Sequence, residues 1–296
     1  MQKYIRSFRF YLTALLLLLS LSGSTQEKSK PKIFGIETYD GNNYTGQIIS
    51  SDSVKVIFKS DKLGEITLKQ ADIKKMVALD ANIEKGDHYW YPNPQSTRYF
   101  FSPNGYGLKK GEGYYQNIWV MINSFAIGLN DYVSVGGGTI PLFLFAGTPT
   151  PVWVTAKVSI PVSKDKINLG AGLLAGGVLG QSGTGFGIFY GIGTLGSRDA
   201  NISLGIGYGF ADGTISSSPM INLNGMIRVG PRGYLLTENY LFPNGSGSTL
   251  LMSFGARTII KEAGLDYGLF IPFVSGSDLI AGPWLGITIP FGKNKK

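Results

Sequence analysis

The longest regular pattern in the chain is an alternation of apolar residues with glycine or small polar residues, from about residue 97 to residue 291. Between 201 and 210, for example, Ile, Leu, Tyr and Phe take every second position, and Asn, Ser and Gly fill the others. A period of two is typical of β-strands, because successive side chains point to opposite faces of a sheet. The pattern predicts twelve strands, with ten as the alternative count: 97–108, 112–127, 131–145, 151–161, 166–178, 184–195, 199–210, 217–230, 232–243, 248–260, 264–273 and 279–291.

Two properties of this region favour a transmembrane β-barrel over a soluble sandwich, which would also alternate. The less apolar face carries Gly, Ser and Asn with few charges, whereas a sheet facing water normally carries Lys and Glu. The predicted strands also approach the ~9–11 residues that cross a bilayer at a tilt. We therefore predict an all-β chain in which residues 97–291 form an antiparallel outer-membrane β-barrel.

Residues 32–79 follow a different pattern, in which short alternating runs are separated by turn-forming residues. They predict a small five-stranded β-domain. Its segments DGNNYTGQI (40–48) and LGEITL (63–68), with DIKKM (72–76), resemble Sm-like small β-barrels. That resemblance implies the fold of this domain only, and RNA is not carried over as its ligand. The predicted strands are 33–38, 45–50, 54–59, 65–69 and 73–79.

Between these two regions, residues 80–96 are rich in aromatic residues and prolines. We interpret them as a linker or as a plug-like crossing strand. Composition changes close to their end, since all but six of the 42 glycines lie at or after Gly105. A domain boundary is therefore expected in this stretch.

Residues 1–24 begin with basic residues, continue with the apolar run Leu12–Leu19 and end with small residues. This layout predicts a cleaved signal peptide rather than an anchoring helix, because the apolar run is shorter than the ~20 residues that span a bilayer. Cleavage would reduce the net charge from +8 to about +5. A net positive charge this small does not indicate nucleic acid as a partner.

The residue inventory argues against an enzyme and against a metal site. The chain has one histidine, His88 in the linker, and no cysteine. A hydrolase needs a base beside its nucleophile, and a zinc site needs several His or Cys ligands. We therefore expect no catalytic residues, no metal and no cofactor. The dinucleotide-like spacing of Gly191–Gly196 lies inside an alternating strand, so we attribute it to the glycine-rich composition.

Charged residues on the less apolar face are the candidate functional residues of the barrel. By the phase of their strands, Lys157, Arg228, Arg257 and Asp266 would face the lumen, and Glu238 is added although its strand alternates poorly. We expect Glu238 to pair with Arg228 and Arg257. Such a network would either set ion selectivity or serve as a structural set of ion pairs. Under the first hypothesis, Glu238→Gln raises anion preference.

The last predicted strand places Leu285, Ile287, Ile289 and Phe291 on one face. It resembles the closing-strand signal of bacterial outer-membrane barrels, which the insertion machinery recognises through a terminal aromatic residue. Here the basic tail 292–296 follows that residue, which departs from the signal. The barrel region as a whole, through 109–117, 128–131 and 237–239, resembles the uncharacterised glycine-rich outer-membrane barrels of Gram-negative bacteria. That resemblance implies a fold and a location, and no activity.

The function expected from these observations is a passive outer-membrane channel or small-solute carrier. Inward glycines would leave space in the lumen for it. The alternative is a non-conducting membrane anchor that presents the small domain to a periplasmic protein. A lipid-hydrolysing enzyme is disfavoured by the single histidine. The expected partners are outer-membrane lipid, the barrel-insertion machinery and a periplasmic protein that binds residues 32–79. An even strand count would place that domain and the tail in the periplasm.

Overall fold

The computed structural model describes residues 32–60, 62–79, 82–85, 88–244, 247–273 and 281–292. The expected signal peptide, 1–24, and the tail after Gly292 lie outside the described residues. Within the described ranges, no helix has both the length and the apolar character needed to cross a membrane. The chain is nearly all β, as predicted, with two separate antiparallel sheets that carry most of its residues.

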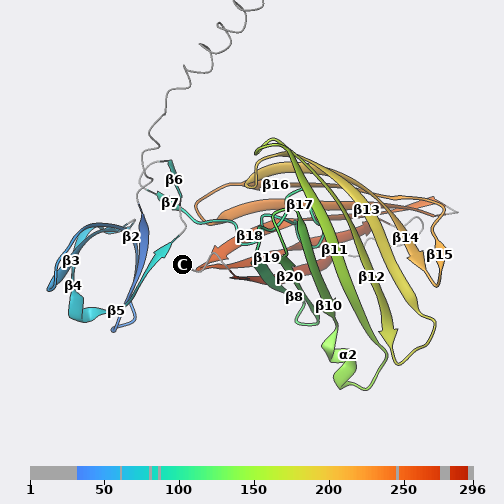
Figure 1. Ribbon diagram of the computed structural model, residues 1–296, viewed down its shortest axis with the longest axis horizontal. Coiled ribbons are helices and arrows are strands. Elements are labelled where there is room, and N and C mark those ends of the chain that lie inside the picture. The colour runs from blue at the N-terminus through green and yellow to red at the C-terminus, as the bar shows by residue number, and fades with distance from the viewer. Residues whose placement is uncertain are drawn as a thin grey trace, which may run out of the picture. The chain divides into compact units, whose positions relative to one another are not determined.

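The first sheet has five strands in the order β4-β3-β2-β1-β5 (Figure 1). Its buried centre is formed by Ile36 of β1 with Val56 and Phe58 of β3, the two strands on either side of β2. All five predicted strands are present to within two residues. The Sm-like relationship stays a prediction. The strands are β1 (Ile33–Thr38), β2 (Asn43–Ser51), β3 (Lys55–Ser60), β4 (Gly64–Lys69) and β5 (Ile73–Leu79), with a short 3₁₀ turn at Gln70–Asp72 before β5.

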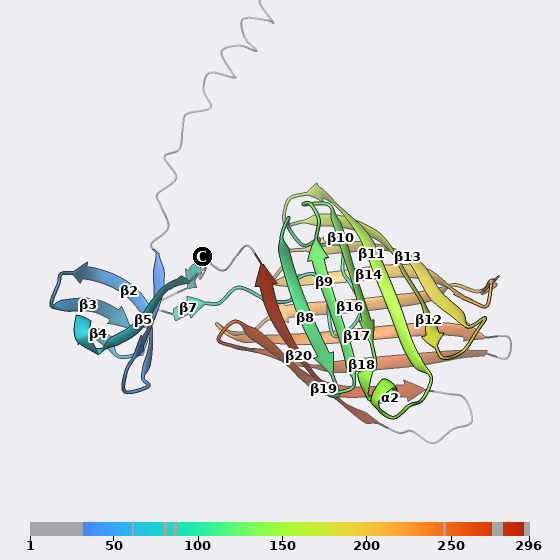
Figure 2. The same cartoon turned by 60° about the horizontal axis from the view of Figure 1, so that its bottom comes forward.

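The second sheet is a closed barrel of twelve antiparallel strands, in which each strand pairs with the next and β20 pairs with β8 (Figures 1 and 2). The predicted fold class and the count of twelve are confirmed. The strands are β8 (Glu112–Ile118), β9 (Ile122–Gly128), β10 (Val133–Thr139), β11 (Thr150–Ser163), β12 (Ile167–Leu179), β13 (Gly185–Gly196), β14 (Ala200–Ala211), β16 (Met220–Arg228), β17 (Gly233–Asn244), β18 (Gly247–Ile260), β19 (Ala263–Phe273) and β20 (Gly282–Gly292); the short β15 (Thr214–Ile215) folds back on β14.

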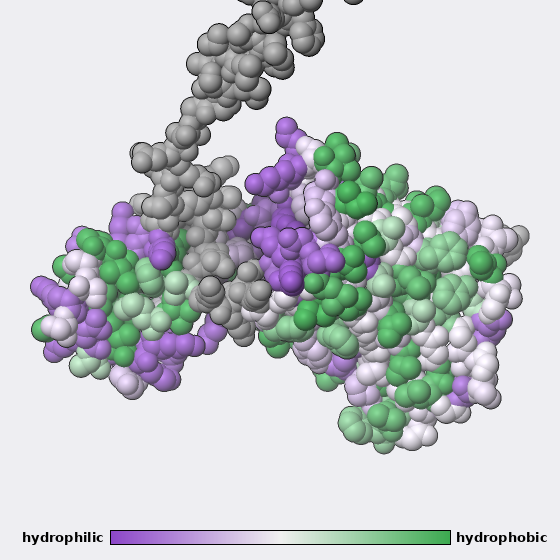
Figure 3. All heavy atoms as spheres, viewed as in Figure 1, coloured by the Kyte–Doolittle hydropathy of each residue, from purple (hydrophilic) through white to green (hydrophobic). Residues whose placement is uncertain are grey.

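The barrel is apolar outside and polar inside, the reverse of a soluble barrel. In β14, Leu204 is 61% exposed and points outward, whereas Asn201 and Ser203 are buried. Val154 of β11 is 66% exposed in the same way. Hydrophobic residues accordingly spread over the outer face of the barrel in Figure 3. The apolar positions of the alternating pattern thus face outward and the polar positions face the lumen, as the sequence indicates.

The count of twelve is right although two of the predicted strands are wrong. Residues 97–108 form no barrel strand, and the predicted strand 112–127 is a hairpin of β8 and β9. Its turn places Trp119 (φ 53°) and Val120 (φ 64°) in the left-handed region, and Met121 N donates to Ile118 O at 3.1 Å. Such turns normally carry Asn-Gly, so Trp-Val gave no turn signal. The predicted strand 131–145 also ends early, where Pro141 begins the helix α2 (Pro141–Phe145).

The barrel closes where β20 pairs with β8, from Gly286 opposite Ile118 to Gly292 opposite Glu112. Leu285, Ile287, Ile289 and Phe291 are all exposed on the outer face of this strand. The Phe291 ring covers Gly113, where an added Cβ would collide with it. The predicted face is thus present at the seam, and its recognition by an insertion machinery stays a prediction.

Candidate functional site

The chain enters the barrel lumen before it forms the first barrel strand. A hairpin of β6 (Asn82–Lys85) and β7 (His88–Trp90) lies in the predicted linker, and residues 91–108, here called the plug, run from it to β8. Inside the plug, the side chains of Tyr99, Phe100 and Asn104 are fully buried. Its only internal strand-like pairing is the isolated bridge between Arg98 and Pro103. The plug is therefore a coiled segment whose partners lie on the barrel wall.

Apolar packing holds one end of the plug. Tyr91, Tyr99 and Phe100 form a buried cluster with wall residues of β16, β17 and β18. The Phe100 ring also packs at 5.3 Å from the ring of Trp284 on β20. Aromatic contacts of this kind supply much of the energy of a packed core. The wall residues of the cluster are Met226, Tyr234, Leu236 and Ile259.

Arg257 and Asp266 form a fully buried ion pair beneath the plug. They lie opposite each other on β18 and β19, with Nε to Oδ1 at 2.6 Å and Nη2 to Oδ2 at 2.9 Å. The guanidinium also donates to the carbonyl oxygens of Gln95 (2.9 Å) and Tyr99 (2.7 Å) in the plug. The pair therefore joins two wall strands to the plug backbone.

Arg228 makes a second, separate contact. Its Nη1 lies 3.0 Å from Asp199 Oδ2 in the turn between β13 and β14, and its Nη2 donates to Tyr91 O at 2.7 Å. Tyr234 donates to the other Asp199 oxygen at 2.6 Å. This group fixes the entry of the plug at the rim of the barrel.

Glu238 binds the plug backbone and not the arginines. Its Oε2 accepts hydrogen bonds from the N–H groups of Phe101 and Ser102, both at 2.9 Å. Its Oε1 accepts one from Tyr240 at 2.7 Å. The expected pairing of Glu238 with Arg228 and Arg257 is therefore corrected. The physical reason is the plug, which offers two unpaired amide donors at a place where the sequence pattern predicted empty lumen.

Lys157 of β11 also reaches the plug, where its Nζ donates to Tyr106 O at 2.6 Å. All five charged residues proposed from the sequence thus lie on the inner side of the wall. They do not form one network across the lumen. Each makes its main contact with the plug or with one neighbouring strand, which corrects the expected cross-lumen network.

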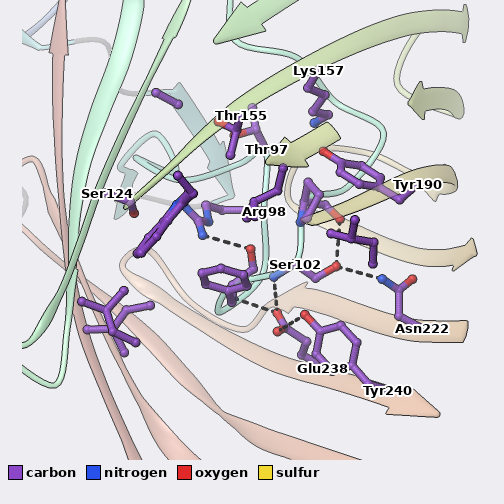
Figure 4. A pocket seen from close by; sticks show the side chains of 18 of the residues that line it. Thr97, Arg98, Ser102, Ser124, Thr155, Lys157, Tyr190, Asn222, Glu238 and Tyr240 are labelled. Atoms are coloured by element: carbon purple, nitrogen blue, oxygen red, sulfur yellow. Dashed lines mark hydrogen bonds between the residues drawn. The ribbon is translucent and has the colours of Figure 1, made fainter. Parts of the chain in front are cut away.

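Above the plug, the lumen holds a cavity of about 580 Å³. Its floor is formed by plug residues such as Arg98, Phe101 and Ser102, and it extends to Trp119 in the turn between β8 and β9. Figure 4 shows Lys157 and Tyr190 higher in the view than Ser102, Asn222 beside Ser102 and hydrogen-bonded to it, and Glu238 and Tyr240 below it. The volume falls within the roughly 300–1,000 Å³ typical of small-molecule sites. The plug therefore fills the half of the lumen nearest the start of β8, and the half nearest Trp119 contains the cavity.

Sequence reasoning missed Arg98, and its plug-like segment at 80–96 overlaps only the start of the plug, which extends through the predicted strand 97–108. The stretch Ser102-Pro103-Asn104-Gly105 is a turn signal inside the predicted strand 97–108, and it could have excluded that strand. Asp199, the partner of Arg228, lies in a short turn and carries no periodic signal. Within the described ranges, no group of three or more His, Asp or Glu side chains is placed to hold a metal ion.

No protein-family model and no curated protein matches the chain. One solved structure, described as "KdgM porin in complex with disordered oligogalacturonate", is similar with a TM-score of 0.44 and 9% sequence identity. The alignment covers 61% of this chain and 98% of that one. Oligogalacturonate is the ligand of that porin, and it is not transferred to this chain.

Proposed function

We propose that the chain is an outer-membrane channel or carrier that takes a small solute into the hollow half of its lumen and releases it when the plug moves. The observation that carries this proposal is the cavity of about 580 Å³ bounded below by the plug. An anchor needs no such space, whereas a solute carrier needs a site of about this size.

An outer-membrane location is supported by the outer surface of the barrel. Its apolar side chains would be costly in water and are matched to lipid. The closed ring also satisfies the strand backbone internally, as a bilayer requires. Because the number of antiparallel strands is even, the start of β8 and the end of β20 lie at the same rim of the barrel. The turns on that side, 129–132, 164–166, 197–199, 229–232 and 261–262, are short, as is typical of periplasmic turns.

This orientation places the plug at the periplasmic side and the cavity at the outer side. The longer connections 140–149 and 212–219 then lie at the outer mouth. A solute would enter from outside, pass the rim near Trp119 and stop at Phe101 and Ser102. Passage into the periplasm requires the plug to shift, because the plug occupies the lower lumen and is held there by hydrogen bonds to Glu238 and Arg257.

The same contacts support a second candidate, the non-conducting anchor that presents residues 32–79 to a periplasmic partner. The number of hydrogen bonds between plug and wall favours a permanently closed lumen. The two candidates differ in one respect, which is whether the plug moves. The test therefore has to immobilise the plug and measure conductance.

Because the chain has no cysteine, an introduced pair is unique. Ser102 Oγ accepts a hydrogen bond from Asn222 Nδ2 at 3.1 Å, so Ser102→Cys with Asn222→Cys joins plug to wall on oxidation. Planar-bilayer recordings should show discrete steps for the reduced protein, and oxidation should suppress them reversibly. Each single cysteine variant is the control. Absence of steps in both redox states of a folded barrel would reject the channel and favour the anchor.

A further inference from the structure

Two cations line the hollow half of the lumen, Arg98 from the plug and Lys157 from β11. Among the described residues that line it, Glu238 is the single carboxylate, and both of its oxygens already accept hydrogen bonds from the protein. Ion pairs among the described residues include Lys74–Glu37, Arg228–Asp199 and Arg257–Asp266. Neither cation of the cavity takes part in one.

Arg98 is buried and incompletely bonded. Its Nη1 donates to Tyr114 Oη and its Nη2 to Phe101 O, both at 2.9 Å. Its guanidinium also lies 5.2 Å from the centre of the Tyr114 ring. Its Nε, by contrast, is buried and has no hydrogen-bond partner. A buried cation with an unused donor is costly unless an anion completes it.

Lys157 adds a second positive group to the same cavity. Its ammonium has three donors, and the hydrogen bond to Tyr106 O uses one of them. The carbonyl is neutral, so it satisfies a donor without balancing the charge. Arg98 and Lys157 are labelled in Figure 4, on the plug and on the wall of the same cavity.

The rest of the cavity is mainly apolar and aromatic, which determines what kind of anion fits. A highly hydrated anion such as a sugar acid would lose its water against these rings without compensation. An anion with an apolar body would instead gain from burial there. The aromatic residues concerned are Trp119, Trp153, Phe242, Phe270 and Trp284.

We propose that the solute of this cavity is an amphipathic monocarboxylate, with its carboxylate at Arg98 and Lys157 and its apolar body among the aromatic rings. This inference rests on the proposed function, because it names the class of solute taken into the same cavity. A carboxylate suits Arg98, since a guanidinium edge presents parallel donors in the plane of the group it binds.

Three of the four tryptophans of the chain line the cavity, which provides a direct readout. We would titrate the detergent-purified full chain with 11-bromoundecanoate and, separately, with the matched neutral 11-bromoundecanol. Bromine quenches tryptophan fluorescence on close contact. The carboxylate should bind about tenfold or more tightly than the alcohol, as expected for a charge-assisted hydrogen bond.

Arg98→Gln and Lys157→Gln should each weaken carboxylate binding and leave alcohol binding unchanged. Lys110→Gln, at an exposed position outside the cavity, is the matched control. Because Arg98 also supports the plug, each variant is first checked for the mobility shift of a folded barrel, and Lys157→Gln on the wall gives an independent result. Lost preference in both cavity variants supports the proposal.

Three other outcomes distinguish the solute cavity from its preference for a carboxylate. Saturable quenching that is equal for acid and alcohol would overturn the carboxylate proposal and leave the solute cavity standing. Absence of saturable quenching by either compound would overturn both. A preference that survives both cavity substitutions would assign the anion site elsewhere and overturn the roles of Arg98 and Lys157.

Discussion

Arg257 on β18 and Asp266 on β19 stand directly opposite each other, and two hydrogen bonds join their fully buried side chains. The remaining donors of Arg257 reach two carbonyl oxygens of the plug. A single wall residue therefore links strand register to plug position. Loss of its partner should affect the barrel and the plug together.

Asp266→Asn should destabilise the folded barrel by about 3–5 kcal/mol, because it leaves the buried charge of Arg257 without its counter-ion. The free energy of unfolding can be measured from the loss of the gel-mobility shift in urea. Asp165→Asn, in a turn with φ of 56°, which asparagine also tolerates, is the matched control. Equal stabilities of the two variants would show that the pair contributes little to the fold.

Glu238→Gln should raise the frequency of conductance steps, since a neutral amide holds the Phe101 and Ser102 N–H groups less strongly than a carboxylate. The strand pattern alone predicts a change of ion preference for this variant, whereas the plug contacts make opening frequency the property to measure. Glu65→Gln, the same exchange in the small sheet, serves as the control. Unchanged opening in a bilayer recording would contradict a role of Glu238 in holding the plug.

Gly113→Ala should lower the yield of closed barrel, because the added methyl group meets the Phe291 ring across the seam and the Ala126 carbonyl of β9. The measurement is the fraction of protein that shows the faster, unboiled band on a gel. Gly185→Ala is the control, since nothing lies within 4 Å of a Cβ at that position. A full yield of closed Gly113→Ala barrel would mean that the seam adapts to a larger residue.

Val120→Gly should stabilise the barrel by up to about 1 kcal/mol. A β-branched residue in the left-handed region costs roughly 1–2 kcal/mol, and part of that gain is offset by the greater chain entropy of glycine. Val120 is 83% exposed, so its removal costs little packing. Val120→Ala keeps the unfavourable backbone conformation and should give no such gain. Urea midpoints of the three proteins test this.

The sequence is sufficient for the barrel because the wall repeats one rule, apolar outward and small or polar inward, over twelve strands. It is insufficient where a single residue departs from the rule. Trp119 and Val120 turn the chain without a turn residue, so a hairpin is hidden inside an apparently continuous strand. Conversely, the plug alternates enough around Phe100 to imitate a strand.

The candidate site illustrates the same limit. Strand phase placed Lys157, Arg257 and Asp266 correctly on the inner side of the wall. It could not give the contacts of Lys157 and Arg257 with the plug, because their acceptors there are backbone carbonyl oxygens, which every residue carries. Glu238 shows the consequence most clearly, since a lumen assumed to be empty left only the arginines as partners for it.

The plug leads directly into β8, and β8 completes its pairing only with β20, the last strand of the barrel. Residue 112 must therefore meet residue 292 before the wall is whole, which makes closure one of the most distant contacts in the chain. Until then the barrel is an open sheet, and residues 91–108 can settle on its inner face from the side. Afterwards they could enter only by threading through an end. The connectivity therefore implies an order of folding. The plug docks on the inner face of the open sheet first, and the pairing of β20 with β8 then encloses it.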